Sequence, residues 1–304
     1  MGTMSVNACR GYLPLFRVIM ALWAASPAVG QTPGDAARPA GTVRLAMLRA
    51  VPVKWDLAAN FAVFEKGVQL AAQAKADILV TPECWLDGYV SPTKESTPEK
   101  ILGIAQDPRD SEYLRRVAAA ARDHRLVVCF GFTSREEGKA FDAAGLWDAD
   151  GRCLGIYHKT HLQRHDLQYA PGQSLPVWPT RWGDVGIMIC ADRRWSETAR
   201  VLRLEGARLI LNPSYGFHGD LNEAMMRTRA YENQCFIVFA HPQESLVTGP
   251  TGKVLFKEDT KEGQPPRVQV GVCDVDLSQA RDDNHLRDRR PELYRIISAP
   301  GPSE

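Results

Sequence analysis

The chain has 304 residues, of which 44% are hydrophobic and 24% charged, with 37 Lys and Arg against 36 Asp and Glu. This composition is that of a globular protein and excludes a mostly disordered chain, a collagen-like fibre and a coiled coil. The formal net charge of +1 provides no field that would attract nucleic acid or an anionic membrane, so we expect a small molecule or another protein as partner.

Residues 1–30 have the pattern of a secretory signal. Arg10 and Arg17 come first, the short apolar stretch 18–25 follows, and small residues end the segment. The apolar stretch is too short to span a bilayer, and no other run approaches that length. We therefore predict export, periplasmic or secreted, with a cytoplasmic protein that keeps a disordered tail as the alternative. Without this segment the net charge becomes −1, because two arginines and no acidic residue leave.

A linker over 31–41 precedes the body of the chain, residues 42–280, in which short apolar runs alternate with stretches of helical periodicity. We predict strands over 43–48, 77–80, 126–132, 185–189, 208–211, 236–240 and 268–275, and helices over 60–76, 113–124, 198–205 and 221–233. Asp150-Gly151, between the runs 141–147 and 153–157, indicates a hairpin, and two glycines suggest another within 247–254. Residues 281–304 are predicted to be a charged, solvated tail.

This alternation of helices and buried strands predicts an α/β fold in which helices cover sheets. The hairpins predict mixed sheets. No segment rich in Pro, Gly or Ser divides the body, so we expect one domain. The seven cysteines lack paired spacing, and in a chain of this length they do not indicate a disulfide scaffold. Cys129, Cys235 and Cys273 lie in apolar runs and are predicted to be core thiols.

Three side chains that can do chemistry stand at the ends of predicted strands. Cys190 ends the run 186–189 and precedes a predicted helix, a position that favours a reactive thiolate and offers backbone N–H groups for an oxyanion. Glu83 follows the strand 77–80 after Thr81-Pro82, and Lys159 directly follows the run 153–158. Open α/β sheets bind ligands at the carboxyl ends of their strands. Each residue alone has a plainer interpretation: a buried structural thiol, a solvated carboxylate and a surface lysine.

Together the three residues suit one reaction. A thiol attacks a carbonyl or nitrile carbon, a carboxylate takes its proton, and an ammonium stabilises the tetrahedral charge. Spacing along the chain does not show that the three groups meet.

The sequence resembles the nitrilase superfamily, the carbon–nitrogen hydrolases, over nearly all of residues 42–276. Five segments carry the resemblance in family order: Thr81-Pro82-Glu83, Tyr157-His158-Lys159-Thr160-His161-Leu162, Gly186-Ile187-Met188-Ile189-Cys190-Ala191-Asp192 with Arg193, Trp195 and Glu197 beyond it, 206–214, and 229–233. The resemblance implies a four-layer α-β-β-α sandwich, a Glu83–Lys159–Cys190 triad, no metal or cofactor, and a homo-oligomer.

One segment departs from the family pattern. Many members carry a second Glu shortly before the Pro-Gly that follows the Lys motif, and here Pro171-Gly172 is preceded by His165 and Asp166. Either residue could orient Lys159 or a substrate, and the substitution leaves the substrate class open.

Other residues near the predicted strand ends are candidates for shaping the site. The backbone N–H of Ala191 is predicted to help hold the oxyanion. The side chains predicted to line the pocket are those of Trp85, Tyr89, Trp195, Tyr215 and Phe217, with His218 and His241 as further candidates and ordinary packing as the alternative for each. A metal site built from His158, His161 and His165 is disfavoured, because a strand end and loop provide no i, i+4 ligand face.

The resulting hypothesis is hydrolysis of a non-peptide C–N bond in a small linear amide or N-carbamoyl compound through a Cys190 thioester. A nitrilase that converts a nitrile to a carboxylic acid is the alternative, but true nitrilases tend to follow the Cys with Trp-Glu where this chain has Ala191-Asp192. A non-catalytic small-molecule-binding protein of the same fold is the other alternative.

Overall fold

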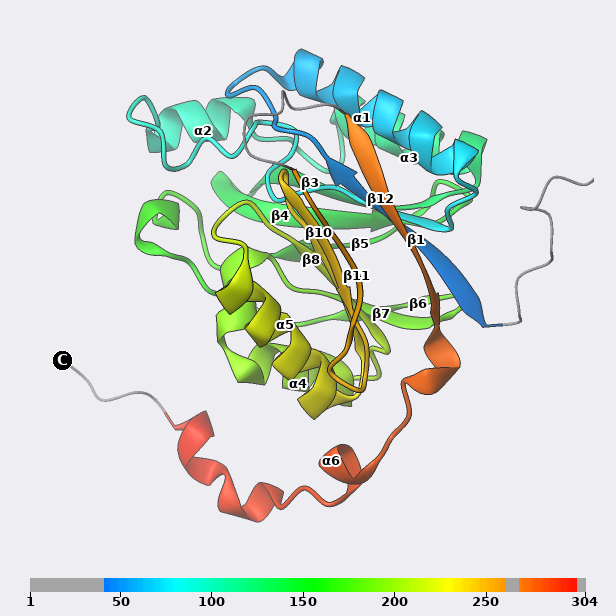
Figure 1. Ribbon diagram of the computed structural model, residues 1–304. Coiled ribbons are helices and arrows are strands. Elements are labelled where there is room, and N and C mark those ends of the chain that lie inside the picture. Colours follow the sequence, from blue (N-terminus) through cyan, green and yellow to red (C-terminus); the bar gives the residue numbers. More distant parts are fainter. Residues whose placement is uncertain (1–40, 261–267, 300–304) are drawn as a thin grey trace, which may run out of the picture. The chain divides into compact units, whose positions relative to one another are not determined.

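Two six-stranded sheets form the centre of the computed structural model, which describes residues 41–260 and 268–299 (Figure 1). The strand order of the first sheet is β12 (Gln269–Asp276), β1 (Thr42–Arg49), β2 (Ile78–Val80), β3 (Val127–Glu136), β4 (Lys139–Trp147), β5 (Cys153–His158). The strand order of the second sheet is β11 (Val254–Asp259), β10 (Glu244–Thr248), β9 (Phe236–Ala240), β8 (Leu209–Pro213), β7 (Gly183–Ile187), β6 (Val177–Thr180). The central strands β1–β3 and β7–β9 run parallel and their outer neighbours antiparallel, which confirms the prediction of mixed sheets.

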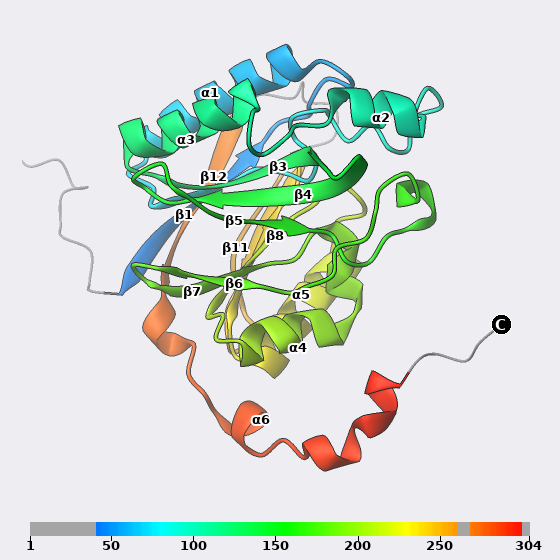
Figure 2. The same cartoon turned by 180° about the vertical axis from the view of Figure 1, so that it is seen from behind.

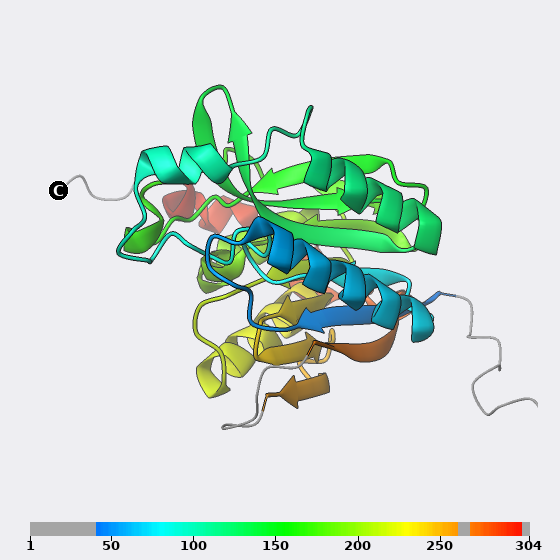
Figure 3. The ribbon, with the colours of Figure 1, turned by 90° about the horizontal axis from the view of Figure 1, so that it is seen from above.

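Helices cover the outer face of each sheet. Figure 3 looks down on α1 (Leu57–Gln73) and α3 (Glu112–His124), which pack on the first sheet. On the opposite side α4 (Ser196–Leu204) and α5 (Asp220–Asn233) pack on the second sheet, as the view from behind also shows (Figure 2). The predicted four-layer α-β-β-α sandwich is therefore confirmed.

The hydrophobic core of the described residues has four parts: one between the sheets, one under each helix pair, and a smaller one around Tyr89, Ile101 and Tyr169. Between the sheets, Leu45 and Val80 of the first sheet share a fully buried cluster with Ile187 and Leu211 of the second. These strands are buried on both faces, which explains why they read as continuous apolar runs in the sequence. Within the described residues no helix is long and apolar enough to cross a membrane.

Two elements lack a clear sequence signal. Helix α2 (Pro98–Ile104) is capped by Thr97, whose Oγ1 accepts from the N–H of Lys100, but it buries only Ile101 and so shows no apolar stripe. Strand β6 carries Pro179, which is tolerated there because β6 is an edge strand.

The described part of the tail is mostly exposed, as predicted, although two arginines of α4 bind its beginning to the body. Arg203 of α4 donates to Asp282, and Arg200 donates to the backbone oxygen of His285 in α6 (Asn284–Arg287). Short 3₁₀ segments complete the described chain at Leu277–Gln279, Pro291–Leu293 and Arg295–Ser298. The six described cysteines are all free, and the sequence likewise indicated no disulfide scaffold. The predicted export signal and the linker up to residue 40 lie outside the described residues.

Gly131 of β3 allows the loop after β2 to lie directly against the sheet. A Cβ built on Gly131 would lie 2.3 Å from the backbone oxygen of Pro82, so any side chain would push that loop away. The N–H of Gly131 donates to Oγ1 of Thr81, and its carbonyl accepts from the N–H of Leu86. The close approach therefore positions Glu83, which lies between these two hydrogen bonds.

We expect Gly131→Ala to lower the free energy of unfolding by about 1–3 kcal/mol, because the clash is with backbone that cannot rotate away. Gly103→Ala is the matched control: it lies in α2, its Cβ would meet nothing within 4 Å, and we expect it to add about 0.5–1 kcal/mol. Urea denaturation of both variants tests this, and a Gly131→Ala midpoint equal to that of the unmodified chain would contradict the packing argument.

Candidate active site

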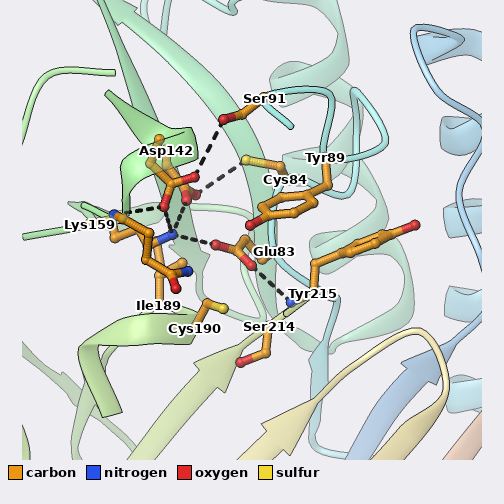
Figure 4. A network of polar contacts seen from close by, with 12 residues as sticks. Glu83, Cys84, Tyr89, Ser91, Asp142, Lys159, Ile189, Cys190, Ser214 and Tyr215 are labelled. Carbon is orange, nitrogen blue, oxygen red and sulfur yellow. Dashed lines mark hydrogen bonds and ion pairs between the residues drawn. The ribbon is translucent and has the colours of Figure 1, made fainter. Parts of the chain in front are cut away.

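The ammonium of Lys159 lies among three carboxyl groups that are fully buried (Figure 4). Its Nζ is 2.7 Å from Oε1 of Glu83, 3.0 Å from Oδ2 of Asp142 and 2.7 Å from Oδ2 of Asp166, and all four side chains are 0% exposed. The structure thus brings Glu83 and Lys159 together, although they are far apart in the sequence. It also adds Asp142, which sequence reasoning missed.

Asp166, and not His165, reaches Lys159. Asp166 lies in the 3₁₀ turn Arg164–Asp166 and also accepts from the N–H of Gln163. His165 is 40% exposed, and its Nε2 is 2.8 Å from the hydroxyl of Tyr89. Of the two candidates that precede Pro171-Gly172, the one that contacts Lys159 is therefore Asp166.

Backbone contacts hold Glu83 and Lys159 in place. The carboxylate of Glu83 accepts from the N–H of Tyr215 at 2.8 Å, which links the loop after β2 to the loop after β8. The N–H of Lys159 donates to the carbonyl of Asp142, extending the pairing of β5 with β4, and its carbonyl accepts from Gly172. Because the backbones of Asp142 and Lys159 are paired, their side chains meet at the same end of the sheet.

Cys190 follows β7 at the first position of the 3₁₀ turn Cys190–Arg194 and has a left-handed φ of 43°. Its thiol is 1% exposed and lies beside the group formed by Lys159 and Glu83 (Figure 4). The backbone N–H groups of Tyr215 and Gly216 lie near enough to the sulfur to lower its pKa. The N–H groups near the sulfur therefore include two from the loop after β8, which the sequence did not indicate. Ala191, whose N–H was predicted to help hold the oxyanion, is buried and directly follows Cys190 in the turn.

The electrostatic environment favours an ionised sulfur. Burial alone would raise the pKa of Cys190, but the cations of Lys159 and Arg193 outweigh it, so the pKa lies below its usual value. Burial raises the pKa of Glu83 to about 8, and the negative charge of Cys190 adds to this. Burial also raises the pKa of the other described cysteines, Cys84, Cys129, Cys153, Cys235 and Cys273. Cys190 is the described cysteine whose surroundings favour the thiolate.

Asp192 connects the end of β5 to the turn that carries Cys190. Its buried carboxylate accepts from the hydroxyl of Tyr157 at 2.7 Å, from Nδ1 of His161 at 2.9 Å and from the N–H of Ile189 at 2.9 Å. Trp195, predicted to line the pocket, is 39% exposed and stacks on the His161 ring at a centroid distance of 4.3 Å. Trp195 therefore packs on His161, at the exposed side of the link between β5 and the Cys190 turn.

Tyr215 lies at the site as predicted, but Trp85 does not. The Tyr215 ring stacks on Tyr89 at 4.7 Å, and the ammonium of Lys54 lies 4.3 Å from its centre. Trp85 is fully buried under α1, where its Nε1 donates to the backbone oxygen of Asn60. The expectation that Trp85 lines the pocket is corrected accordingly.

His241 and Phe217 act through the backbone of the loop after β8. The Nε2 of His241 faces the carbonyl oxygens of Tyr215 and Gly216 at 2.9 and 3.0 Å and therefore carries the proton, and burial lowers its pKa to about 3. The carbonyl of Phe217 accepts from Arg193. These contacts fix the loop whose N–H groups face Glu83 and Cys190.

The three histidines of the disfavoured metal site do not converge. His158 binds Glu136, His161 binds Asp192, and His165 binds Tyr89. In the described part of the chain, the side chains that could hold an ion are His218, Glu244 and Asp259, whose ligand atoms lie within 4.8 Å of one another. The ammonium of Lys257 already lies 3.8 Å from Asp259, and both Glu244 oxygens accept hydrogen bonds from Gly219 and Asn222.

The chain is similar in sequence to proteins of one known family. The family model for carbon-nitrogen hydrolases matches residues 44–284. A hydrolase in the pqqF 5' region of Pseudomonas protegens is 31% identical over 279 residues, 84% of this chain and 92% of the relative. An (R)-stereoselective amidase from Pseudomonas sp. is 29% identical over 234 residues, 70% of this chain and 80% of the relative.

Among solved structures, an amidase from Nesterenkonia sp. has the same fold, with a TM-score of 0.70 at 23% identity over 84% of this chain and 97% of that one. The family match covers most of the described residues and includes Glu83, Lys159 and Cys190. The chain therefore belongs to the carbon–nitrogen hydrolases of the nitrilase superfamily.

Proposed function

We propose that this chain hydrolyses the non-peptide C–N bond of a small linear amide or N-carbamoyl compound through a thioester on Cys190. The observation that carries the proposal is the buried cluster in which Lys159 contacts Glu83 beside a sulfur whose pKa is lowered. Such a cluster supplies a nucleophile, a proton acceptor and a fixed positive charge within one small volume.

In the first half of the reaction the Cys190 sulfur bonds to the amide carbon, and the carbonyl π electrons move to the oxygen. The ammonium of Lys159 and the backbone N–H of Ala191 stabilise this oxyanion. Glu83, which holds the thiol proton, gives it to the departing nitrogen as the C–N bond breaks, so ammonia or an amine leaves and a thioester remains. A carboxyl group with a pKa of about 8 is suited to hold and release this proton near neutral pH.

In the second half Glu83, now a carboxylate, takes a proton from water while the water oxygen bonds to the thioester carbon. The same donors hold the second oxyanion. The C–S bond then breaks, the carboxylic or carbamic acid leaves, and the proton on Glu83 and the thiolate of Cys190 are restored.

The three carboxyl groups around Lys159 cannot all be charged. One ammonium among three buried carboxylates would leave two uncompensated negative charges in a buried site, which is costly. Burial raises the pKa of Asp142 well above its usual value, although the ammonium of Lys159 acts in the opposite direction. We infer that Asp142 is neutral and that Asp166 is the charged partner of Lys159.

We expect Cys190→Ala to abolish ammonia release while the fold is kept, because the sulfur is the proposed nucleophile. The measurement is an ammonia-release screen over aliphatic amides, ureido acids, carbamoyl-amines and nitriles, with mass spectrometry for an acyl adduct on Cys190. Cys153→Ala, which removes another thiol, is the control and should keep activity. Turnover by Cys190→Ala at the rate of the unmodified chain would refute the mechanism.

Glu83→Gln tests the raised pKa of Glu83 through stability. The folded chain keeps the Glu83 proton up to about pH 8, whereas the unfolded chain loses it near its usual pKa of 4.5. The stability that this proton contributes is complete below that lower value and is lost as the pH rises through about 8. Relative to the unmodified chain, Glu83→Gln should therefore become more stable as the pH is raised from 5 to 9.

Denaturant unfolding at several pH values measures this difference, with Glu95→Gln at an exposed position as the control. A difference between Glu83→Gln and the unmodified chain that does not change with pH would show that Glu83 has an ordinary pKa.

Asp142→Asn and Asp166→Asn form a matched pair, because both lose one contact with Lys159. Asn resembles a protonated Asp, so we expect Asp142→Asn to lower kcat/KM only a few-fold and to leave the pH profile in place. Asp166→Asn removes the proposed counter-charge, and we expect a loss of more than about 100-fold. The pH dependence of kcat/KM from pH 5 to 9 distinguishes them, and equal losses in the two variants would assign a charge to Asp142.

A further inference from the structure

A second buried cation, Arg193, contacts the Cys190 sulfur. Its Nη1 donates to Sγ at 3.5 Å, its Nη2 donates to the carbonyl of Phe217 at 2.7 Å, and the side chain is 0% exposed. The guanidinium also lies over the rings of Phe217 and Phe239, at 4.4 and 5.3 Å from their centres. Arg193 is thus held firmly against the sulfur.

In the part of the chain that the structure describes, the Cys190 sulfur is the group in contact with Arg193 that can become an anion. In the described residues its guanidinium forms no ion pair with a carboxylate, and its buried Nε has no hydrogen-bond partner. Arginine does not lose its proton in proteins, so the charge cannot be removed by titration. Burying an unpaired guanidinium costs several kcal/mol, of which contacts with aromatic rings recover only part. The charge of Arg193 is therefore stabilised most when Cys190 is negative.

The other cation near Cys190 is already engaged. Lys159 contacts Glu83, Asp142 and Asp166, so only part of its charge acts on the sulfur. The groups that face Cys190 are Lys159 after β5, Glu83 after β2, Tyr89 in the same loop, Arg193 in its own turn, and the N–H groups after β8. Among these groups Arg193 is the cation without a carboxylate partner.

We propose that Arg193 is a further catalytic residue of the hydrolysis proposed above, and that its guanidinium holds the Cys190 sulfur as a thiolate before the substrate arrives. The proton that leaves the sulfur resides on Glu83, so no external acid or base is needed. This assignment rests on the proposed function for its role in turnover, but the state of the sulfur can be measured without a substrate.

The test is the pH dependence of alkylation of the full chain by iodoacetamide, followed by peptide mass spectrometry at Cys190. In the unmodified chain the rate should reach half its maximum well below pH 8.5, the usual pKa of a thiol. Arg193→Met should move this midpoint upward by about one pH unit or more and slow alkylation at pH 6 by about tenfold or more. Arg193→Lys keeps a positive charge, so its midpoint should lie between those of the unmodified chain and Arg193→Met.

Arg194→Met is the matched control, because Arg194 is the next residue, also lies over the Phe217 ring and is exposed. We expect its midpoint to equal that of the unmodified chain. Cys190→Ala measures labelling of the other thiols. If Arg193→Met does not fold, Arg193→Gln, which can still donate to the carbonyl of Phe217, takes its place with the same expected shift.

Two results would overturn the proposal: a midpoint of the unmodified chain at or above pH 8.5, or an Arg193 variant whose midpoint equals that of Arg194→Met. These outcomes are separable from failure of the proposed function. A shifted midpoint in a chain that releases no ammonia from any compound refutes the hydrolysis and keeps the thiolate assignment. Normal turnover with an unshifted midpoint refutes the role of Arg193 and keeps the hydrolysis.

Discussion

The buried ammonium of Lys159 is the interaction on which the site depends. Glu83, Asp142 and Asp166 come from separate segments of the chain, and burying these polar groups would be expensive without the hydrogen bonds that the Nζ of Lys159 donates to them. Lys159 stabilises all three at once and thereby holds the loop after β2, strand β4 and the 3₁₀ turn Arg164–Asp166 around one point. Loss of the ammonium would leave buried negative charge, which is more damaging than the loss of a hydrogen bond.

The charges proposed for the resting site balance. With protons on Asp142 and Glu83, Lys159 is matched by Asp166, and Arg193 is matched by the thiolate of Cys190. A neutral total allows these groups to be almost completely buried, and burial in turn strengthens each interaction because little water screens it. Both cations lower the pKa of Cys190, and Lys159 in addition organises the acids.

The sequence predicted the parts of this site that depend on strand ends. Glu83, Lys159 and Cys190 each follow an apolar run, and the carboxyl ends of strands meet at one edge of a sheet. Asp142 lies inside β4, where its contact depends on the pairing with β5, although one charged residue in the apolar run 141–147 was a usable signal. Trp85 was misplaced because Cys84 adopts a left-handed φ of 42° and turns the chain toward α1. Such backbone reversals have no pattern in composition or periodicity.

The same reasoning explains why the substrate could not be named from the sequence. The groups that the proposed mechanism uses are positioned by regular structure and its hydrogen bonds. Sheet pairing places Lys159, and the hydrogen bonds accepted by Asp192 hold the turn of Cys190 in its uncommon left-handed conformation. The aromatic stack of Tyr89 and Tyr215 beside Lys54 is different, because its members come from three loops. Periodicity predicts where each loop begins, but only the folded chain shows that their side chains meet. The residues of the proposed mechanism thus follow strand ends, which the sequence indicates, whereas the contacts between loops beside them do not follow from it.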